Sequence, residues 1–206
     1  MRFATTSLIK QVQWLPAAAL LAIILTGLLM PGYSSLSQHM SELGLLDHPA
    51  ARVLHIGAIV GGASVFLFGI GLALHPLRCF RWSAISAMIF GGAYITAGVF
   101  HSGPMHGLYG ATMFYIVVPA FFVAELPVSW RDSAIRHVSL AASWLSLTYM
   151  WFMFSGLEPQ SIRGLTQRIG ALIIFGWYPI ASYWLLRKTA KTPSSVAASS
   201  ALRARE

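Results

Sequence analysis

Residues 15 to 30 read LPAAALLAIILTGLLM, a run without a single charged side chain. Its length approaches the roughly 20 apolar residues that a helix needs to cross the hydrocarbon core of a bilayer. Five similar runs follow, and each is bounded by charged residues, Gly or Pro. We therefore predict six membrane-spanning helices, at approximately 15–30, 55–74, 83–100, 108–124, 138–156 and 169–186.

The composition of the whole chain also indicates a membrane protein. Of its 206 residues, 56% are hydrophobic and only 10% are charged, whereas a soluble domain has about 25% charged residues. A soluble fold could hide one or two wholly apolar helices, but not six. We predict an all-α polytopic membrane protein, with one six-helix transmembrane domain over residues 1–190 and a disordered cytoplasmic tail over residues 191–206.

The basic residues predict the orientation of these spans. All but three of the 14 Lys and Arg side chains lie in the N-terminal segment, the second and fourth loops and the C-terminal tail. Cytoplasmic loops carry such an excess of basic residues, so we expect both termini in the cytoplasm. Nucleic-acid binding is excluded as the reason for the net charge of +8, because the basic residues stand at the ends of apolar spans.

Two further features bear on the cell membrane and on helix packing. Asparagine is absent and Arg outnumbers Lys, which fits a bacterial source and the bacterial cytoplasmic membrane. The first apolar run lacks a small-residue cleavage site, so we expect it to be retained as a helix. Gly57 and Gly61 form a GxxxG motif, and Gly91 and Gly92 extend the pattern. Such small faces favour a seam inside the bundle, with a homo-oligomer or larger membrane complex as the alternative.

The predicted outer loops differ in character from the inner ones. They carry most of the histidines and half of the acids, around the stretch Ser-Gln-His-Met-Ser-Glu-Leu-Gly at residues 37–44. His39 and Glu42 are three residues apart, which places them on one face of a helix. Because Gly44 is a common helix stop, we predict a short helix over residues 36–43 at the mouth of the bundle.

The outer histidines raise the question of chemistry. His39, Glu42, His101 and His106 could supply the ligands of a divalent metal such as zinc, with a water as nucleophile. Ser41 paired with a histidine would be a metal-free alternative. The candidate catalytic residues are therefore Ser41, Glu42, His101 and His106. The same side chains could instead form a polar plug that only holds the loop against the bundle.

Two arginines on the outer side are exceptions to the charge rule. Arg163 and Arg168 could pair with outer acids such as Glu42, or bind a lipid phosphate or a substrate carboxylate through two hydrogen bonds. His55 lies within apolar sequence, where an ionisable residue is a functional candidate. The candidate ligand-binding residues are Arg163, Arg168, His39 and His55, and membrane lipids are the expected partners.

Several of these residues resemble the pattern of a known family. Tyr33 after the first span, Ser41-Glu42-Leu43-Gly44, a histidine before the fourth span, and Arg163-Gly164 with Gln167-Arg168-Ile169 are similar to the bacterial and archaeal membrane family called domain of unknown function 998. The resemblance covers residues 12–188. It carries over to Ser41, Glu42, Gly44, His106 and Arg168. The stretch 100–104 lacks the acidic residue that often stands there in the family, and the resemblance implies a fold and a topology without an established activity.

Three classes of function remain open from the sequence. The favoured one is a protein that binds a lipid or small ligand, or serves as an accessory membrane subunit, because no strong catalytic motif is present. The first alternative is a membrane-embedded hydrolase, metal-dependent or metal-free, that acts on a lipid ester, amide or phosphoester. The second is a permease-like transporter, although the spans lack the acids that ion-coupled transporters place near the membrane midplane.

Overall fold

The structure of the protein is a computed structural model that describes residues 2–100, 105–106 and 108–191. All regular structure in these residues is helical, with no strand among them, which confirms the all-α class. The predicted tail beyond residue 191 lies outside the described residues. The helices are α1 (Arg2–Lys10), α2 (Leu15–Leu29), α3 (Met40–Leu43), α4 (Arg52–Ala73), α5 (Trp82–Val99), α6 (Tyr109–Thr112), α7 (Val117–Glu125), α8 (Ser133–Phe154) and α9 (Arg163–Lys191), with 3-10 turns η1 (Gln11–Gln13), η2 (Pro49–Ala51), η3 (Met113–Ile116) and η4 (Val128–Trp130).

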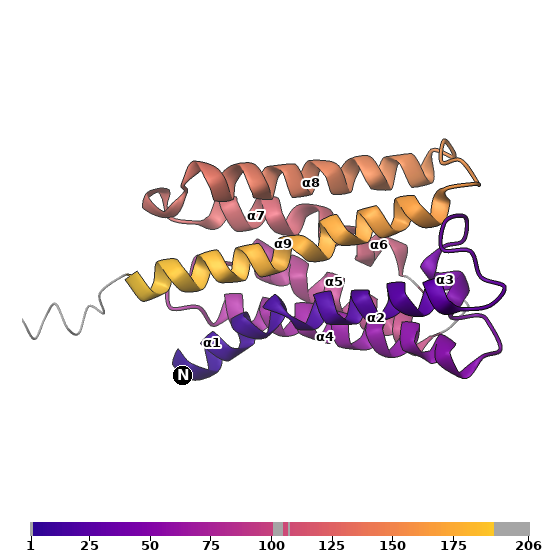
Figure 1. Ribbon diagram of the computed structural model, residues 1–206. Coiled ribbons are helices and arrows are strands. Elements are labelled where there is room, and N and C mark those ends of the chain that lie inside the picture. The colour runs from indigo at the N-terminus through magenta and orange to yellow at the C-terminus, as the bar shows by residue number, and fades with distance from the viewer. Residues whose placement is uncertain (1, 101–104, 107, 192–206) are drawn as a thin grey trace, which may run out of the picture.

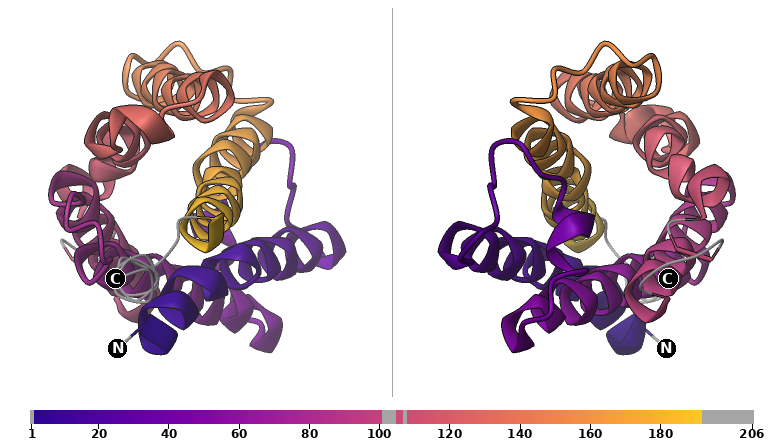
Figure 2. Two further views of the ribbon diagram at one scale, coloured as in Figure 1. Left: turned by 90° about the vertical axis from the view of Figure 1, so that its left-hand side faces the viewer. Right: turned by 90° about the vertical axis from the view of Figure 1, so that its right-hand side faces the viewer.

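The long helices run along a common axis, and the bundle has two distinct ends (Figure 1). We call one of them the terminal end, because α1, the last turns of α9 and the loops 74–81 and 126–132 lie there. The opposite end is the loop end, which carries α3 and the loops 30–51 and 155–162. End-on views show α9 between the α1–α2 segment and α8 (Figure 2).

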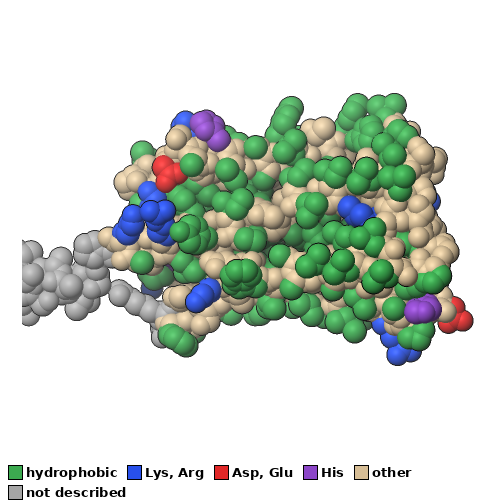
Figure 3. Space-filling view, viewed as in Figure 1, with side chains coloured by type: hydrophobic (Ala, Val, Ile, Leu, Met, Phe, Trp, Pro, Cys, Tyr) green, Lys and Arg blue, Asp and Glu red, His purple; other side chains and the backbone are tan. Residues whose placement is uncertain are grey.

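Four stretches of the described chain are long and apolar enough to cross a membrane, namely Phe3–Leu29, Pro49–Ala73, Trp82–Val99 and Arg163–Lys191. Gly110–Glu125 is a shorter apolar helix. These five stretches contain or overlap the first, second, third, sixth and fourth predicted spans. The fifth predicted span falls in α8, which is not among the four. The surface agrees with a membrane environment, because most charged side chains on the face seen in Figure 3 gather at the two ends.

Helix α8 is long, but inward-facing hydroxyl groups lower its mean hydropathy. Ser139 and Ser146 are buried. The Ser139 hydroxyl accepts a hydrogen bond from the Trp177 indole of α9 at 3.0 Å. The Ser143 hydroxyl accepts one from the Ala120 amide of α7 at 3.1 Å. These groups are satisfied inside the bundle, as a helix in lipid requires.

The N-terminal helical stretch begins earlier than the predicted first span. Helix α1 packs against α4 and α9, and a Cβ on Gly71 of α4 would lie only 2.8 Å from Ile9. The chain then passes through η1 before α2 begins. Pro16 has no amide hydrogen, so the α-helical bonding pattern is interrupted ahead of it. Within η1, the Gln11 amide donates to the Ser64 carbonyl of α4 at 2.8 Å, which satisfies a polar side chain inside the bundle.

Part of the predicted small-residue seam lies between α4 and α5, whereas Gly57 faces Ile23 of α2 and a Cβ on Gly92 would meet nothing within 4 Å. A Cβ on Gly62 would come within 2.7 Å of the Gly91 carbonyl, and one on Gly98 within 2.7 Å of the His55 carbonyl. Such distances leave no room for any side chain beyond hydrogen. The small residues therefore serve internal packing, as the sequence predicted, and hold the two backbones in direct contact.

Large aromatic side chains fill the core. Phe68, Phe122, Trp177 and Tyr178 are all at most 2% exposed. The Phe122 and Trp177 rings meet edge to face with centroids 5.4 Å apart, and Phe68 meets Tyr178 in the same way at 5.5 Å. Edge-to-face contacts of this kind join α4, α7 and α9 into one unit.

Candidate functional site

Helix α3 stands at the centre of the loop end, and it is shorter than predicted. The sequence predicted a helix over 36–43, but only Met40–Leu43 is α-helical. The preceding residues form turns, in which the Gln38 side chain accepts the Ser34 amide at 2.7 Å and the Ser34 hydroxyl accepts the Ser37 amide at 3.3 Å. Side-chain bonds of this kind compete with helix formation.

The predicted pair His39 and Glu42 does stand together at the start of α3. The Glu42 carboxylate accepts the His39 backbone amide at 3.0 Å, as in a capping box. Met40 and Leu43 point into the core and are 6% and 0% exposed. The short helix therefore presents its polar side to the loops and anchors itself through its apolar side.

Arg163, at the start of α9, holds this loop from one side. Its guanidinium lies 2.9 Å from the Glu42 carboxylate and donates to the Ser37 carbonyl at 2.9 Å. The expectation that an outer arginine pairs with Glu42 is confirmed for Arg163. Both side chains are about one-third exposed, so water screens the pair and its contribution to stability is modest.

Arg168 holds the same loop from within the protein. It is only 6% exposed, and no Asp or Glu of the described residues pairs with it. Its guanidinium instead donates to the Gly164 carbonyl at 2.7 Å and to the Tyr33 hydroxyl at 2.8 Å. Burial raises the pKa of Tyr33, so its hydroxyl remains protonated and donates to the His39 carbonyl at 2.9 Å. Neutral acceptors thus bind the two terminal nitrogens of the buried guanidinium, while its Nε has no partner among the described residues. Removing these acceptors or the guanidinium is costly.

The loop 33–42 can approach the start of α9 closely because Gly164 lacks a side chain. A Cβ at that position would lie 2.7 Å from the Ser35 carbonyl and would also collide with the Gln38 carbonyl. The Leu165 amide donates to the Leu36 carbonyl at 3.0 Å, and the Gln167 side chain accepts the Met40 amide. We call this joint between residues 33–42 and residues 158–168 the clasp.

The last part of the clasp is formed by His39 and Glu158. The His39 ring nitrogen Nε2 lies 3.3 Å from a Glu158 carboxylate oxygen, and the Glu158 side chain is only 8% exposed. The Thr166 hydroxyl donates to the other oxygen of the same carboxylate. His39 is therefore turned toward the 155–162 loop, while Glu42 is turned toward Arg163.

The remaining candidates fall in separate places. The His106 ring nitrogen Nδ1 donates to the Phe100 carbonyl at 2.8 Å, and the Ser41 hydroxyl makes no hydrogen bond to another described residue. His101 lies outside the described residues. Within the described part of the chain, no group of three or more His, Cys, Asp or Glu is placed to hold a metal ion. A metal site that includes His101 stays a prediction.

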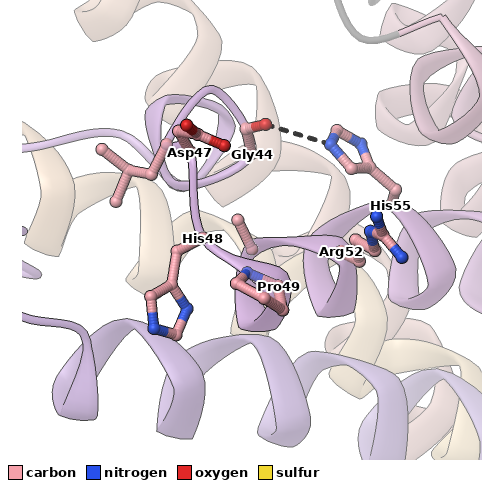
Figure 4. A pocket seen from close by; sticks show the side chains of 8 residues that line it. Gly44, Asp47, His48, Pro49, Arg52 and His55 are labelled. Atoms are coloured by element: carbon pink, nitrogen blue, oxygen red, sulfur yellow. Dashed lines mark hydrogen bonds between the residues drawn. The ribbon is translucent and has the colours of Figure 1, made fainter.

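Beside the clasp lies an open pocket of about 240 Å³, at the start of α4. Its lining includes the charged side chains of Asp47 and Arg52 together with His48 and His55 (Figure 4). The His55 ring donates from Nε2 to the Gly44 carbonyl at 3.1 Å, which holds one wall of the pocket in place. His55 was expected from the sequence. Asp47 and Arg52 were not among the ligand-binding candidates, although Arg52 shares the predicted outer position of Arg163 and Arg168.

A family model described as "Protein of unknown function (DUF998)" matches residues 16–184. The match spans the bundle from the start of α2 to the last turns of α9, including the clasp and the pocket. No curated protein and no solved structure matches the chain.

Proposed function

The chain belongs to the DUF998 family of proteins of unknown function, and we propose that it is a six-span integral membrane protein that binds a lipid or small ligand at its loop end. In this proposal the η3–α7 segment is the fourth span and α8 is the fifth. Both termini face the cytoplasm of a bacterial cell, and the loop end faces outward.

Two observations support this topology. The start of α1 and the end of α9 lie at the same end of the bundle (Figure 1), as an even number of crossings requires. The terminal end also carries the basic loop residues Arg78, Arg81 and Arg131 together with Arg187 and Lys188. An excess of basic residues on the side of the termini is typical of the cytoplasmic face.

Labelling of single cysteines tests the topology. In a Cys79→Ser background, Asp47→Cys at the loop end should react with a membrane-impermeant maleimide added to intact cells. Lys191→Cys at the terminal end should react only after the membrane is permeabilised. The reverse pattern, or equal labelling of both positions in intact cells, would contradict the proposed orientation.

The observation that carries the binding function is the pocket beside the clasp. It is open, it holds about 240 Å³, and it is lined by charged and polar side chains rather than by apolar ones alone. The clasp fixes the loop that forms the pocket wall, because it ties residues 33–42 to the rigid start of α9. A preorganised polar pocket at the level of the membrane surface suits a headgroup or a small polar molecule.

Native mass spectrometry of the purified protein tests this function. The wild-type protein should carry a bound lipid or small ligand through mild detergent extraction. The double variant Asp47→Asn with Arg52→Gln should lose most of it. Arg136→Gln is the matched control, since Arg136 is exposed on α8, away from the loop end. Equal retention by the wild-type protein and the double variant would remove the pocket as the binding site.

A further inference from the structure

The acidic side chain of the pocket, Asp47, differs from the other acids of the described residues in having no partner. Glu42 pairs with Arg163, Glu125 binds the start of α5, Asp132 pairs with Lys188, and Glu158 binds Thr166. Among the acids of the described residues, Asp47 alone has a side chain without a hydrogen bond or an ion pair to another described residue.

The Arg52 side chain also lacks a partner among the described residues. It lines the same pocket as Asp47, yet the two side chains do not form an ion pair with each other. No hydrogen bond joins the Arg52 guanidinium to any other residue that the structure describes. One pocket thus holds a free cation and a free anion on different parts of its wall, where a ligand that carries both charges would satisfy both.

The size and position of the pocket narrow the choice of ligand. A cavity needs roughly 10–15 Å³ of water-accessible space to hold one water, so about 240 Å³ has room for a small organic group. The exposed side chain of Leu45 stands between the lining residues Gly44 and Leu46, which suits a pocket at the lipid surface in the proposed topology. Lipid phosphates lie at that level, and a guanidinium binds phosphate through two parallel hydrogen bonds.

The lining also distinguishes between kinds of ammonium group. Quaternary ammonium ligands are recognised by the faces of aromatic rings, and no Phe, Tyr or Trp lines this pocket. A carboxylate such as that of Asp47 accepts hydrogen bonds, which a primary ammonium can donate and a trimethylammonium cannot. The pocket therefore favours a primary amine.

We propose that the pocket binds a phosphoethanolamine group, with its phosphate on Arg52 and its primary ammonium on Asp47. The group is either the headgroup of a membrane lipid or a free small molecule. The inference rests on the proposed function, since it names the ligand class of the same pocket. His55 and Gly44 both line the pocket, and the bond from the His55 ring to the Gly44 carbonyl joins two parts of its lining.

Binding of defined lipids tests the inference. The full-length protein in detergent is titrated with phosphatidylethanolamine, phosphatidylcholine and phosphatidic acid of identical acyl chains, and bound lipid is counted by native mass spectrometry. Phosphatidylethanolamine should bind about fivefold more tightly than the other two, the factor that one exposed charge pair contributes. Asp47→Asn should abolish this preference, and Arg52→Gln should weaken the binding of all three.

Controls and a soluble competitor separate the outcomes. Arg136→Gln should bind like the wild-type protein, and each variant should elute as a monodisperse species with unchanged helical circular dichroism. If free phosphoethanolamine binds at the pocket and the lipid does not, the inference is supported, and the ligand is a soluble molecule rather than a lipid headgroup. If all three lipids bind equally and the double variant loses this binding, the preference for a phosphoethanolamine group is overturned. The proposed function, binding at this pocket, would still hold. Binding that no pocket substitution alters would overturn both.

Discussion

The two ends of the bundle use their charged residues differently. At the terminal end the acidic residues complete helix ends. Glu125 accepts the backbone amides of Arg81 and Ser83 at 2.9 and 3.1 Å, and Asp132 accepts the Ile135 amide at 3.1 Å. At the loop end the charged residues join separate loops, and Asp47 and Arg52 have no partner at all among the described residues. The described acids of the terminal end are therefore all engaged in structure, whereas Asp47 at the loop end is left open to solvent, as the proposed ligand site requires.

The lengths of the loops explain this contrast. The connections 74–81 and 126–132 are short, so their polar side chains reach only the nearby helix ends and the last turns of α9. Burial acts to raise the pKa of Asp132, but hydrogen bonds from Ile135, Trp184 and Lys188 outweigh it and lower that pKa. The connection 30–51 is long enough to fold back over the bundle, and it needs the clasp to stay in place.

The largest effect is expected at the centre of the clasp. Arg168→Met removes a buried guanidinium and leaves the Tyr33 hydroxyl and the Gly164 carbonyl without their donor. The free energy of unfolding in detergent micelles should fall by about 3 kcal/mol. Arg168→Lys keeps the charge but has fewer hydrogen-bond donors, so its free energy of unfolding should lie between those of the wild-type protein and Arg168→Met. A loss below about 0.5 kcal/mol would mean that the clasp does not hold the loop end together.

At the terminal end, the strongest effect should come from pH. Burial of the His75 ring disfavours its charged form and lowers its pKa to about 4. The neutral ring donates to the Thr189 hydroxyl at 3.2 Å and accepts the Leu77 amide. The unfolded chain binds this proton near pH 6.5, so stability is complete above that pH and is lost as the pH falls toward 4. The loss should reach about 3 kcal/mol.

The control for this pH dependence is His75→Gln, measured by unfolding in micelles between pH 7.5 and 4. It should flatten the curve over that window, although its stability at neutral pH will be lower than that of the wild-type protein. An unchanged slope in this variant would show that other groups, such as His39 with Glu158 at the loop end, dominate the acid response.

A pair of glycine substitutions on α9 compares a position in the clasp with a position outside it. Gly164→Ala should cost about 1 to 3 kcal/mol, because its Cβ would press on the backbone carbonyls of Ser35 and Gln38. Gly176→Ala on the same helix meets nothing within 4 Å, and Ala is the better helix former, so it should be neutral or slightly stabilising. Equal effects at both positions in the same unfolding assay would contradict the close approach at Gly164.

The smallest effect is expected at the surface of the clasp. The pair Glu42–Arg163 is about one-third exposed on each side, so a double-mutant cycle with Glu42→Gln and Arg163→Gln should give a coupling energy of about 0.5 kcal/mol. The coupling should shrink in high salt. A coupling above about 2 kcal/mol would place this pair, rather than Arg168, at the centre of the joint.

The sequence predicted the helical class and the glycine seam, because composition and apolar run length depend only on local residues. It also predicted one pairing of Glu42 with an outer arginine correctly, since few partners of opposite charge exist there. It missed η1 and the early start of the first helical stretch, because these follow from packing of α1 on α4 and α9. It did not join Asp47 to Arg52, because the path of the loop between them sets their distance and the sequence carries no sign of that path.

The contrast between the two ends can be measured directly by hydrogen–deuterium exchange of the protein in nanodiscs. The exchange is compared between nanodiscs of phosphatidylcholine alone and nanodiscs that also contain phosphatidylethanolamine. We predict slower exchange over residues 44–55 at the loop end when phosphatidylethanolamine is present, and unchanged exchange over residues 74–81 and 126–132 at the terminal end. Unchanged exchange over 44–55, or equal slowing at both ends, would contradict the claim that the loop end is the binding end of the molecule.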